Sequence, residues 1–182
     1  ATAAALKRLK LKNATSTLLD IAVQTQNELA WKANQHVQAF AAATYKFEEF
    51  KSKRRSAGFS RLALLVEDAD VAAARAGLAH GVALADGIKL ARDVANRPAN
   101  VCTPTHLAET ALKLGEAHSS IEVEVLEEDA MAKLAMGALL SVSQGSRQPA
   151  KLIILHYRGG AESERPIVLV GKGVTFDSGG IS

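Results

Sequence analysis

Cysteine, aromatic residues and long apolar runs are scarce in this chain, and each shortage excludes a class of protein. Cys102 is the one cysteine, so an internal disulfide is excluded, and a lone thiol fits a reducing compartment such as the cytoplasm. No run of about 18 apolar residues occurs, so we expect no membrane-spanning segment. The net charge of +3 is small and does not demand a nucleic acid or an anionic membrane as a partner.

What the chain has instead is alanine and short apolar segments. Hydrophobic residues make up 48% of the sequence and aromatic residues only 4%, which favours helices packed closely on sheets. Segments with helical spacing alternate with strand-like segments. The sequence therefore predicts an α/β fold in two domains, with mixed sheets flanked by helices and a long helix connecting the domains.

Residues 1–68 have the pattern of one α/β unit. Apolar residues spaced near i, i+3 and i+4 predict a long helix over residues 27–51. The apolar run at residues 61–66 predicts a strand. Composition further predicts a helix over residues 1–12 and a strand over residues 17–23.

The clearest helix is predicted over residues 69–96. Alanine is abundant, proline is absent, and Pro98 ends the pattern. Gly77 and Gly81 fall on one stripe, where they would let another backbone approach closely. A long helix between two α/β segments is typical of a domain connector, and it leaves residues 97–182 as a second unit.

The second unit is predicted to begin with a capped helix. Thr103 is a good N-cap and Pro104 suits the first helical position, which predicts a helix ending near His118. Alternating apolar and acidic residues at 121–126 predict a strand with one wet face. The remaining predicted elements are a helix at 128–136 and strands at 139–143, 152–157 and 167–170.

A glycine-rich loop follows the last predicted strand and carries Lys172 and Asp177. Open α/β sheets bind ligands at the carboxyl ends of buried strands, and glycine lets a ligand approach the backbone. A phosphate-binding loop would need Ser or Thr where Gly173 stands, and a dinucleotide fingerprint would need a glycine where Phe176 stands. A serine nucleophile elbow at Ser178 would also need a glycine where Phe176 stands, so this interpretation has little support.

Two interpretations of this loop remain open from the residues alone. One is a metal site in which the Lys172 amine and the Asp177 carboxylate both bind a cation. The other is a glycine-rich turn with a surface lysine and an aspartate that caps the next helix. A histidine-based metal site has little support, because the histidines lack the close paired spacing of zinc ligands; they are His106, His118 and His156.

The string at residues 170–182, Val-Gly-Lys-Gly-Val-Thr-Phe-Asp-Ser-Gly-Gly-Ile-Ser, resembles the start of the metal-site signature of the leucyl (cytosol) aminopeptidases. The likeness is unbroken over the whole string. Other stretches are similar to family landmarks, in the family's order; they are residues 29–32, 47–51, 96–105 and 143–146.

This resemblance implies a metal-dependent aminopeptidase that hydrolyses the amino-terminal residue of peptides, preferring leucine. Two divalent ions, Mn²⁺ or Zn²⁺ with Mg²⁺ as a further candidate, would activate water between them. Lys172, as a neutral amine, would bind one metal ion, and Asp177 would bind both. The family's catalytic lysine and arginine correspond to positions beyond Ser182. The resemblance also implies a homo-hexamer.

By the same resemblance, the chain is expected to be an internal fragment. Residues 1–68 would be the carboxyl-terminal part of an N-terminal domain, residues 69–96 the connector, and residues 97–182 the first part of the catalytic domain. We expect this fragment alone to be inactive. The alternative function is DNA binding, since some bacterial family members bind DNA and the basic stretches 7–12 and 51–55 are compatible with it.

Overall fold

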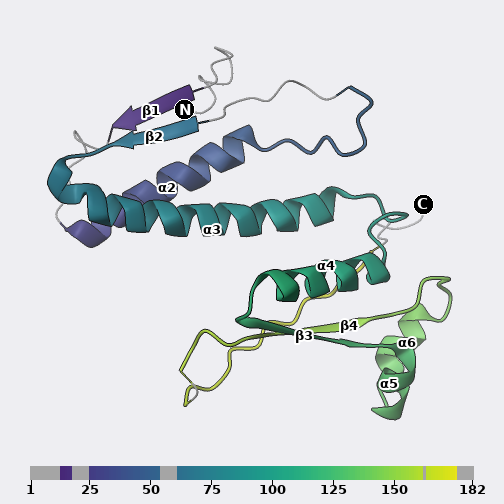
Figure 1. Cartoon of the computed structure of the whole chain (residues 1–182). Coiled ribbons are helices and arrows are strands. Elements are labelled where there is room, and N and C mark those ends of the chain that lie inside the picture. The colour runs from purple at the N-terminus through teal and green to yellow at the C-terminus, as the bar shows by residue number, and fades with distance from the viewer. Residues whose placement is uncertain (1–12, 18–24, 54–60, 162, 176–182) are drawn as a thin grey trace. The chain divides into compact units, whose positions relative to one another are not determined.

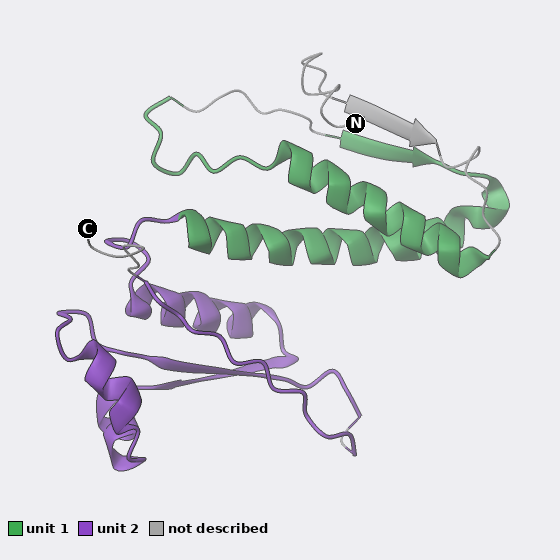
Figure 2. Cartoon of the chain, turned by 180° about the vertical axis from the view of Figure 1, so that it is seen from behind, with its two compact units in different colours: residues 1–96 green, residues 97–182 purple. Residues whose placement is uncertain are grey.

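The computed structural model describes residues 25–53, 61–161 and 163–175, together with the backbone of residues 13–17. The chain divides into two compact units, Ala1–Asn96 and Arg97–Ser182 (Figure 2). Along the chain (Figure 1) the elements of the first unit are β1 (Asn13–Thr17), α2 (Gln26–Thr44), β2 (Arg61–Leu65), the 3₁₀ turn Asp68–Asp70 and α3 (Val71–Asn96). Those of the second unit are α4 (Pro104–Ala117), β3 (Ile121–Leu126), α5 (Glu128–Lys133), α6 (Gly137–Ser143) and β4 (Leu152–Tyr157).

The first unit packs two long helices beside a pair of parallel strands. β1 and β2 run parallel, with Asn13 opposite Arg61. The core lies where α2 meets α3 and β2, and it contains the fully buried Leu29 and Ala33 of α2. Burial of these apolar side chains is the main force that holds α2 in place, since a helix of this length gains little from propensity alone.

The two helices approach each other most closely along a line of small residues. A side-chain carbon added to Gly77 of α3 would overlap the carbonyl oxygen of Ala30 in α2. One added to Gly81 would lie 2.9 Å from Cβ of Val37. The prediction that these two glycines admit a neighbouring backbone is therefore confirmed.

The second unit packs α4 on an antiparallel pair of strands. Thr103 caps α4 by accepting a hydrogen bond from the His106 backbone N–H at 3.2 Å, and Pro104 is the first helical residue. β3 and β4 pair antiparallel, with Ile121 opposite Tyr157. Along the chain, α5 and α6 lie between β3 and β4. Met131 of α5 is completely buried.

The α/β fold class, with one parallel and one antiparallel strand pair in the described part of the chain, agrees with the prediction. The strands predicted at 61–66, 121–126 and 152–157 and the helix predicted at 69–96 are present. Residues 1–12 and most of 17–23 lie outside the described residues.

Three predicted elements differ from the structure in this part of the fold, and the first is the helix predicted over 128–136, which ends at Lys133. Residues 139–143 belong to helix α6 and form no strand, because a short apolar run is compatible with either state until its neighbours decide. The helix predicted over 27–51 ends at Thr44. There the Tyr45 N–H donates to the Ala41 carbonyl at 2.9 Å, and the backbone of Tyr45 turns to an extended conformation.

Candidate functional site

The segment that leads into the glycine-rich loop forms no strand. Residues 167–170 are exposed, between 75% for Val168 and 93% for Val170, and they pair with no neighbouring strand among the described residues. The prediction of a buried strand here is wrong for this structure. A strand is held by cross-strand hydrogen bonds and by cover on its faces, so an apolar composition without a partner strand does not produce one.

Lys172 lies in an open, exposed loop. A side-chain carbon added to Gly171 would meet no atom within 4 Å, and one added to Gly173 would only touch Leu107 at 4.0 Å. Lys172 itself is exposed to solvent. Asp177 lies outside the described residues, so its pairing with Lys172 stays a prediction.

Two histidines of the second unit take part in local hydrogen bonds, one through its ring and one through its backbone. Arg97 Nη1 donates a hydrogen bond to Nε2 of His106 at 2.9 Å, which places the proton of the neutral ring on Nδ1. His118 follows α4, where its backbone N–H donates to the Leu114 carbonyl at 3.1 Å. Within the described residues, no group of three or more His, Cys, Asp or Glu side chains is placed to hold a metal ion.

A second constellation, which sequence reasoning missed, surrounds Tyr45 at the end of α2. The Tyr45 hydroxyl donates a hydrogen bond to Oδ1 of Asp93 at 2.8 Å and accepts one from Nδ2 of Asn96 at 3.1 Å. The Arg92 guanidinium carbon lies 3.7 Å from the centre of the Tyr45 ring, a cation–π contact. From the sequence, Tyr45 is simply one position within the helix predicted over residues 27–51. The spacing of polar residues along α3 is the one signal that could have indicated otherwise.

Lys89 completes this constellation. Its ammonium binds Oδ2 of Asp93 at 2.7 Å. That hydrogen bond, helped by the charges of Asp93 and Asp86, raises the pKa of Lys89 above its ordinary value of 10.5. Partial burial opposes the rise by a smaller amount.

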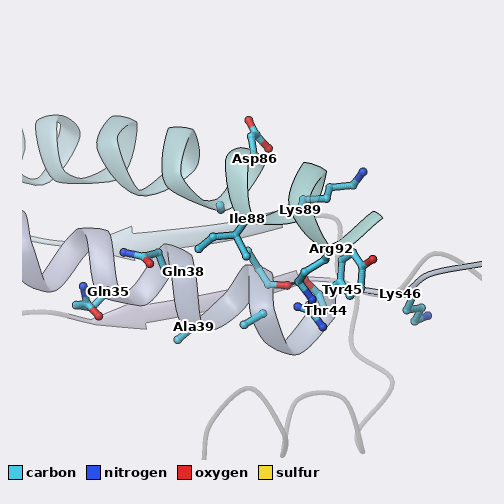
Figure 3. A pocket seen from close by; sticks show the side chains of 13 residues that line it. Gln35, Gln38, Ala39, Thr44, Tyr45, Lys46, Asp86, Ile88, Lys89 and Arg92 are labelled. Atoms are coloured by element: carbon cyan, nitrogen blue, oxygen red, sulfur yellow. Dashed lines mark hydrogen bonds between the residues drawn. The ribbon is translucent and has the colours of Figure 1, made fainter. Parts of the chain in front are cut away.

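An open cavity of about 620 Å³ lies between α2 and α3, beside Tyr45. Figure 3 shows Tyr45, Arg92 and Thr44 gathered at one end and Gln35 toward the other. Its apolar lining comes from Ile88 and from alanines of both helices.

None of the helices in the described residues is both long enough and apolar enough to span a bilayer. Of the basic stretches considered for DNA binding, residues 7–12 lie outside the described residues. In the other, Lys51 pairs with Glu48 at 3.9 Å. These observations give DNA binding no support.

Comparison with known proteins decides the family. The profile described as "Cytosol aminopeptidase family, catalytic domain" matches residues 89–182, which is more than half of the chain. The chain belongs to the cytosol aminopeptidase family. The aminopeptidase profile therefore covers the last turns of α3 and the whole second unit, including Lys172 and Asp177.

Curated proteins of this family resemble the chain along nearly its whole length. A probable cytosol aminopeptidase of Thioalkalivibrio sulfidiphilus is 47% identical over 172 residues, covering 93% of this chain and 34% of that protein. One of Chromohalobacter salexigens is 45% identical over 182 residues, covering 98% of this chain and 36% of that protein. The chain spans about a third of the length of these relatives.

Solved structures agree with the aminopeptidase assignment. A variant of tomato leucine aminopeptidase superposes with a TM-score of 0.85 at 27% identity, covering 98% of this chain and 36% of that one. The bottromycin maturation enzyme BotP, solved in complex with Mn, superposes with a TM-score of 0.68 at 23% identity, covering 84% of this chain and 31% of that one. The second likeness shows the fold alone.

The ligand atoms that the loop offers are of types that bind divalent metal ions. An amine nitrogen and a carboxylate oxygen are both ligands that divalent transition metals accept. Lys172 is exposed, so a cation in solution can reach this residue. Two side chains are fewer than the roughly four to six donors that such ions need.

Proposed function

We propose that the protein that carries this chain is a metal-dependent aminopeptidase, which releases the amino-terminal residue of peptides and prefers leucine. The observation that carries this proposal is the match of the family's catalytic domain to residues 89–182. The likeness to tomato leucine aminopeptidase, at 27% identity over nearly the whole chain, supports the same activity. The second unit would then contribute the first part of the catalytic domain.

Lys172 and Asp177 are the proposed metal ligands. Two divalent ions, Mn²⁺ or Zn²⁺ with Mg²⁺ as a further candidate, would polarise the scissile carbonyl and lower the pKa of the attacking water. Lys172 would bind through its neutral amine, in competition with protons, so binding would strengthen as the pH rises. The accessibility of Lys172 supports this role, and the manganese named with BotP supports a divalent ion in the fold.

The organisation of the protein follows from the same proposal. Residues 1–68 would be the end of an N-terminal domain, residues 69–96 the connector and residues 97–182 the start of the catalytic domain. The full-length protein would act on peptides in the cytoplasm as a homo-hexamer. The 182-residue chain alone would be inactive, because it supplies two metal ligands and no further catalytic group.

The decisive experiment measures release of p-nitroaniline from leucine p-nitroanilide by the full-length protein. Activity should disappear after dialysis against EDTA and return with Mn²⁺ or Zn²⁺, and a panel of aminoacyl p-nitroanilides should show the preference for leucine. Activity that survives complete metal removal would contradict the mechanism. Turnover by the purified 182-residue chain would contradict the expectation that it is inactive.

A further inference from the structure

The contacts between α2 and α3 change character along the two helices. The buried residues of α3 are Ala74, Gly77 and Gly81, all in its amino-terminal half. In the carboxyl-terminal half, Leu84 and Ile88 are 40% and 47% exposed, and the cavity opens between the helices (Figure 3). The fully buried contacts of α3 are therefore confined to its first half.

The polar constellation around Tyr45 links α2 and α3 in the half of α3 that has no fully buried residues. Its three partners on α3, Arg92, Asp93 and Asn96, all lie in the last two turns of the helix. Tyr45 itself is the first residue after α2, so the contact joins the carboxyl-terminal ends of the two helices.

Tyr45 uses its whole side chain in this contact. The ring face receives the Arg92 guanidinium, and the hydroxyl both donates to Asp93 and accepts from Asn96. Lys89 neutralises the second carboxylate oxygen of Asp93, so the hydroxyl meets a carboxylate that is held in position. Hydrogen bonds to a charged group are stronger than neutral ones, which makes the contact with Asp93 the stronger of the two hydrogen bonds of the hydroxyl.

The last turns of α3 are also the first residues of the family's catalytic-domain match, which begins at residue 89. We infer that Tyr45 is a positioning residue: it anchors the start of the catalytic segment to the end of α2. The anchor itself is independent of the chemistry that the protein performs. Its consequence for catalysis rests on the proposed aminopeptidase function.

Hydrogen exchange followed by mass spectrometry tests the anchor in the 182-residue chain and again in the full-length protein. Tyr45→Phe keeps the ring and removes the hydroxyl, so amides of residues 90–96 should exchange about tenfold faster, because two hydrogen bonds, one of them to a carboxylate, are lost. Amides of residues 74–82 should keep their wild-type rates. Tyr157→Phe is the matched control, since Tyr157 is the other tyrosine and is 72% exposed; it should leave both segments unchanged.

Two results would overturn the anchor: unchanged exchange at residues 90–96, or an equal acceleration along all of α3, which would indicate a general loss of stability. Asp93→Asn serves as a graded variant, because its amide oxygen still accepts from Tyr45 while the charge is lost. It should accelerate exchange less than Tyr45→Phe does, and an equal or greater effect would show that the Asp93 charge, and not the Tyr45 hydroxyl, protects these amides.

The catalytic consequence is measured separately in the full-length protein. Tyr45→Phe should lower kcat for leucine p-nitroanilide and leave KM nearly unchanged, because it would loosen the start of the catalytic segment, while Tyr45 itself lies before that segment. Locally faster exchange with an unchanged kcat would overturn the positioning role. If Tyr45→Phe accelerates exchange locally but the wild-type full-length protein has no peptidase activity, the anchor stands and the proposed function is refuted.

Discussion

Gly77 of α3 lies directly against the backbone carbonyl of Ala30 in α2, with no room between them for even one side-chain carbon. Backbone atoms in the middle of two helices cannot move aside as a flexible side chain can. This contact therefore fixes the separation of the helices at the amino-terminal half of α3.

The first prediction follows from that contact. Gly77→Ala should destabilise the chain by about 1–3 kcal/mol, because overpacking outweighs the gain in helix propensity. Gly87→Ala in the same helix is the control. Its added carbon would meet no atom within 4 Å, so it should stabilise by about 0.5–1 kcal/mol. Urea unfolding followed by circular dichroism measures both changes, and a tolerated Gly77→Ala would contradict the close contact.

The second prediction concerns the cap of α4. Thr103→Ala removes the acceptor of the His106 N–H, so it should cost about 1 kcal/mol of unfolding free energy. Thr103→Ser keeps the oxygen and should recover most of that stability. Equal losses in the two variants, measured by thermal unfolding, would show that the hydroxyl does not cap the helix.

The third prediction concerns the raised pKa of Lys89. Its contact with Asp93 stabilises the folded chain while Lys89 is charged, so this contribution is complete below the ordinary value of 10.5 and is lost as the pH rises through the higher folded-state pKa. The side chain is 63% exposed, so the contribution is small, about 0.3 kcal/mol.

Nuclear magnetic resonance titration of the Lys89 side chain measures that pKa directly. Asp93→Asn should move it back toward 10.5, because the main cause of the rise is the hydrogen bond to this carboxylate. Tyrosines titrate in the same pH range. The titration is therefore repeated in Tyr45→Phe, and a pKa that does not respond to Asp93→Asn would refute the assignment.

The fourth prediction concerns the proposed metal ligand. Lys172→Met in the full-length protein should lower activity by about 100-fold or more, since even the partners of metal ligands cost 10–100-fold when removed. Lys113→Met is the control, because Lys113 is an exposed lysine on α4 of the same unit. Metal content measured by mass spectrometry should fall only in the Lys172 variant. Full metal occupancy with unchanged activity would remove Lys172 from the site.

Helices with local signals could be predicted from the sequence, while elements that depend on distant partners could not. Thr103 and Pro104 define the start of α4, and the cap joins residues only three positions apart. The cap could therefore be predicted from the sequence. The apolar run at 167–170 carries a strand composition, yet the pairing that would make it a strand requires neighbours that the described chain does not provide.

The candidate site shows the same division between local and distant information. Lys172 stood out because a rare loop string surrounds it, and its exposure in the structure is compatible with the proposed role. Tyr45 did not stand out, because its partners lie 47 to 51 residues away and only folding brings them together. Asp93 is 48 positions from Tyr45 in the sequence and 2.8 Å from it in space.

Residues 167–170 leave four consecutive branched apolar side chains, Ile, Val, Leu and Val, open to water. Exposed apolar segments of this kind readily pair, as β-strands, with the same segment of other copies of the chain at high protein concentration. Aggregation of the purified 182-residue chain, measured by light scattering, should therefore increase with protein concentration. A charged residue placed within this run should reduce that aggregation.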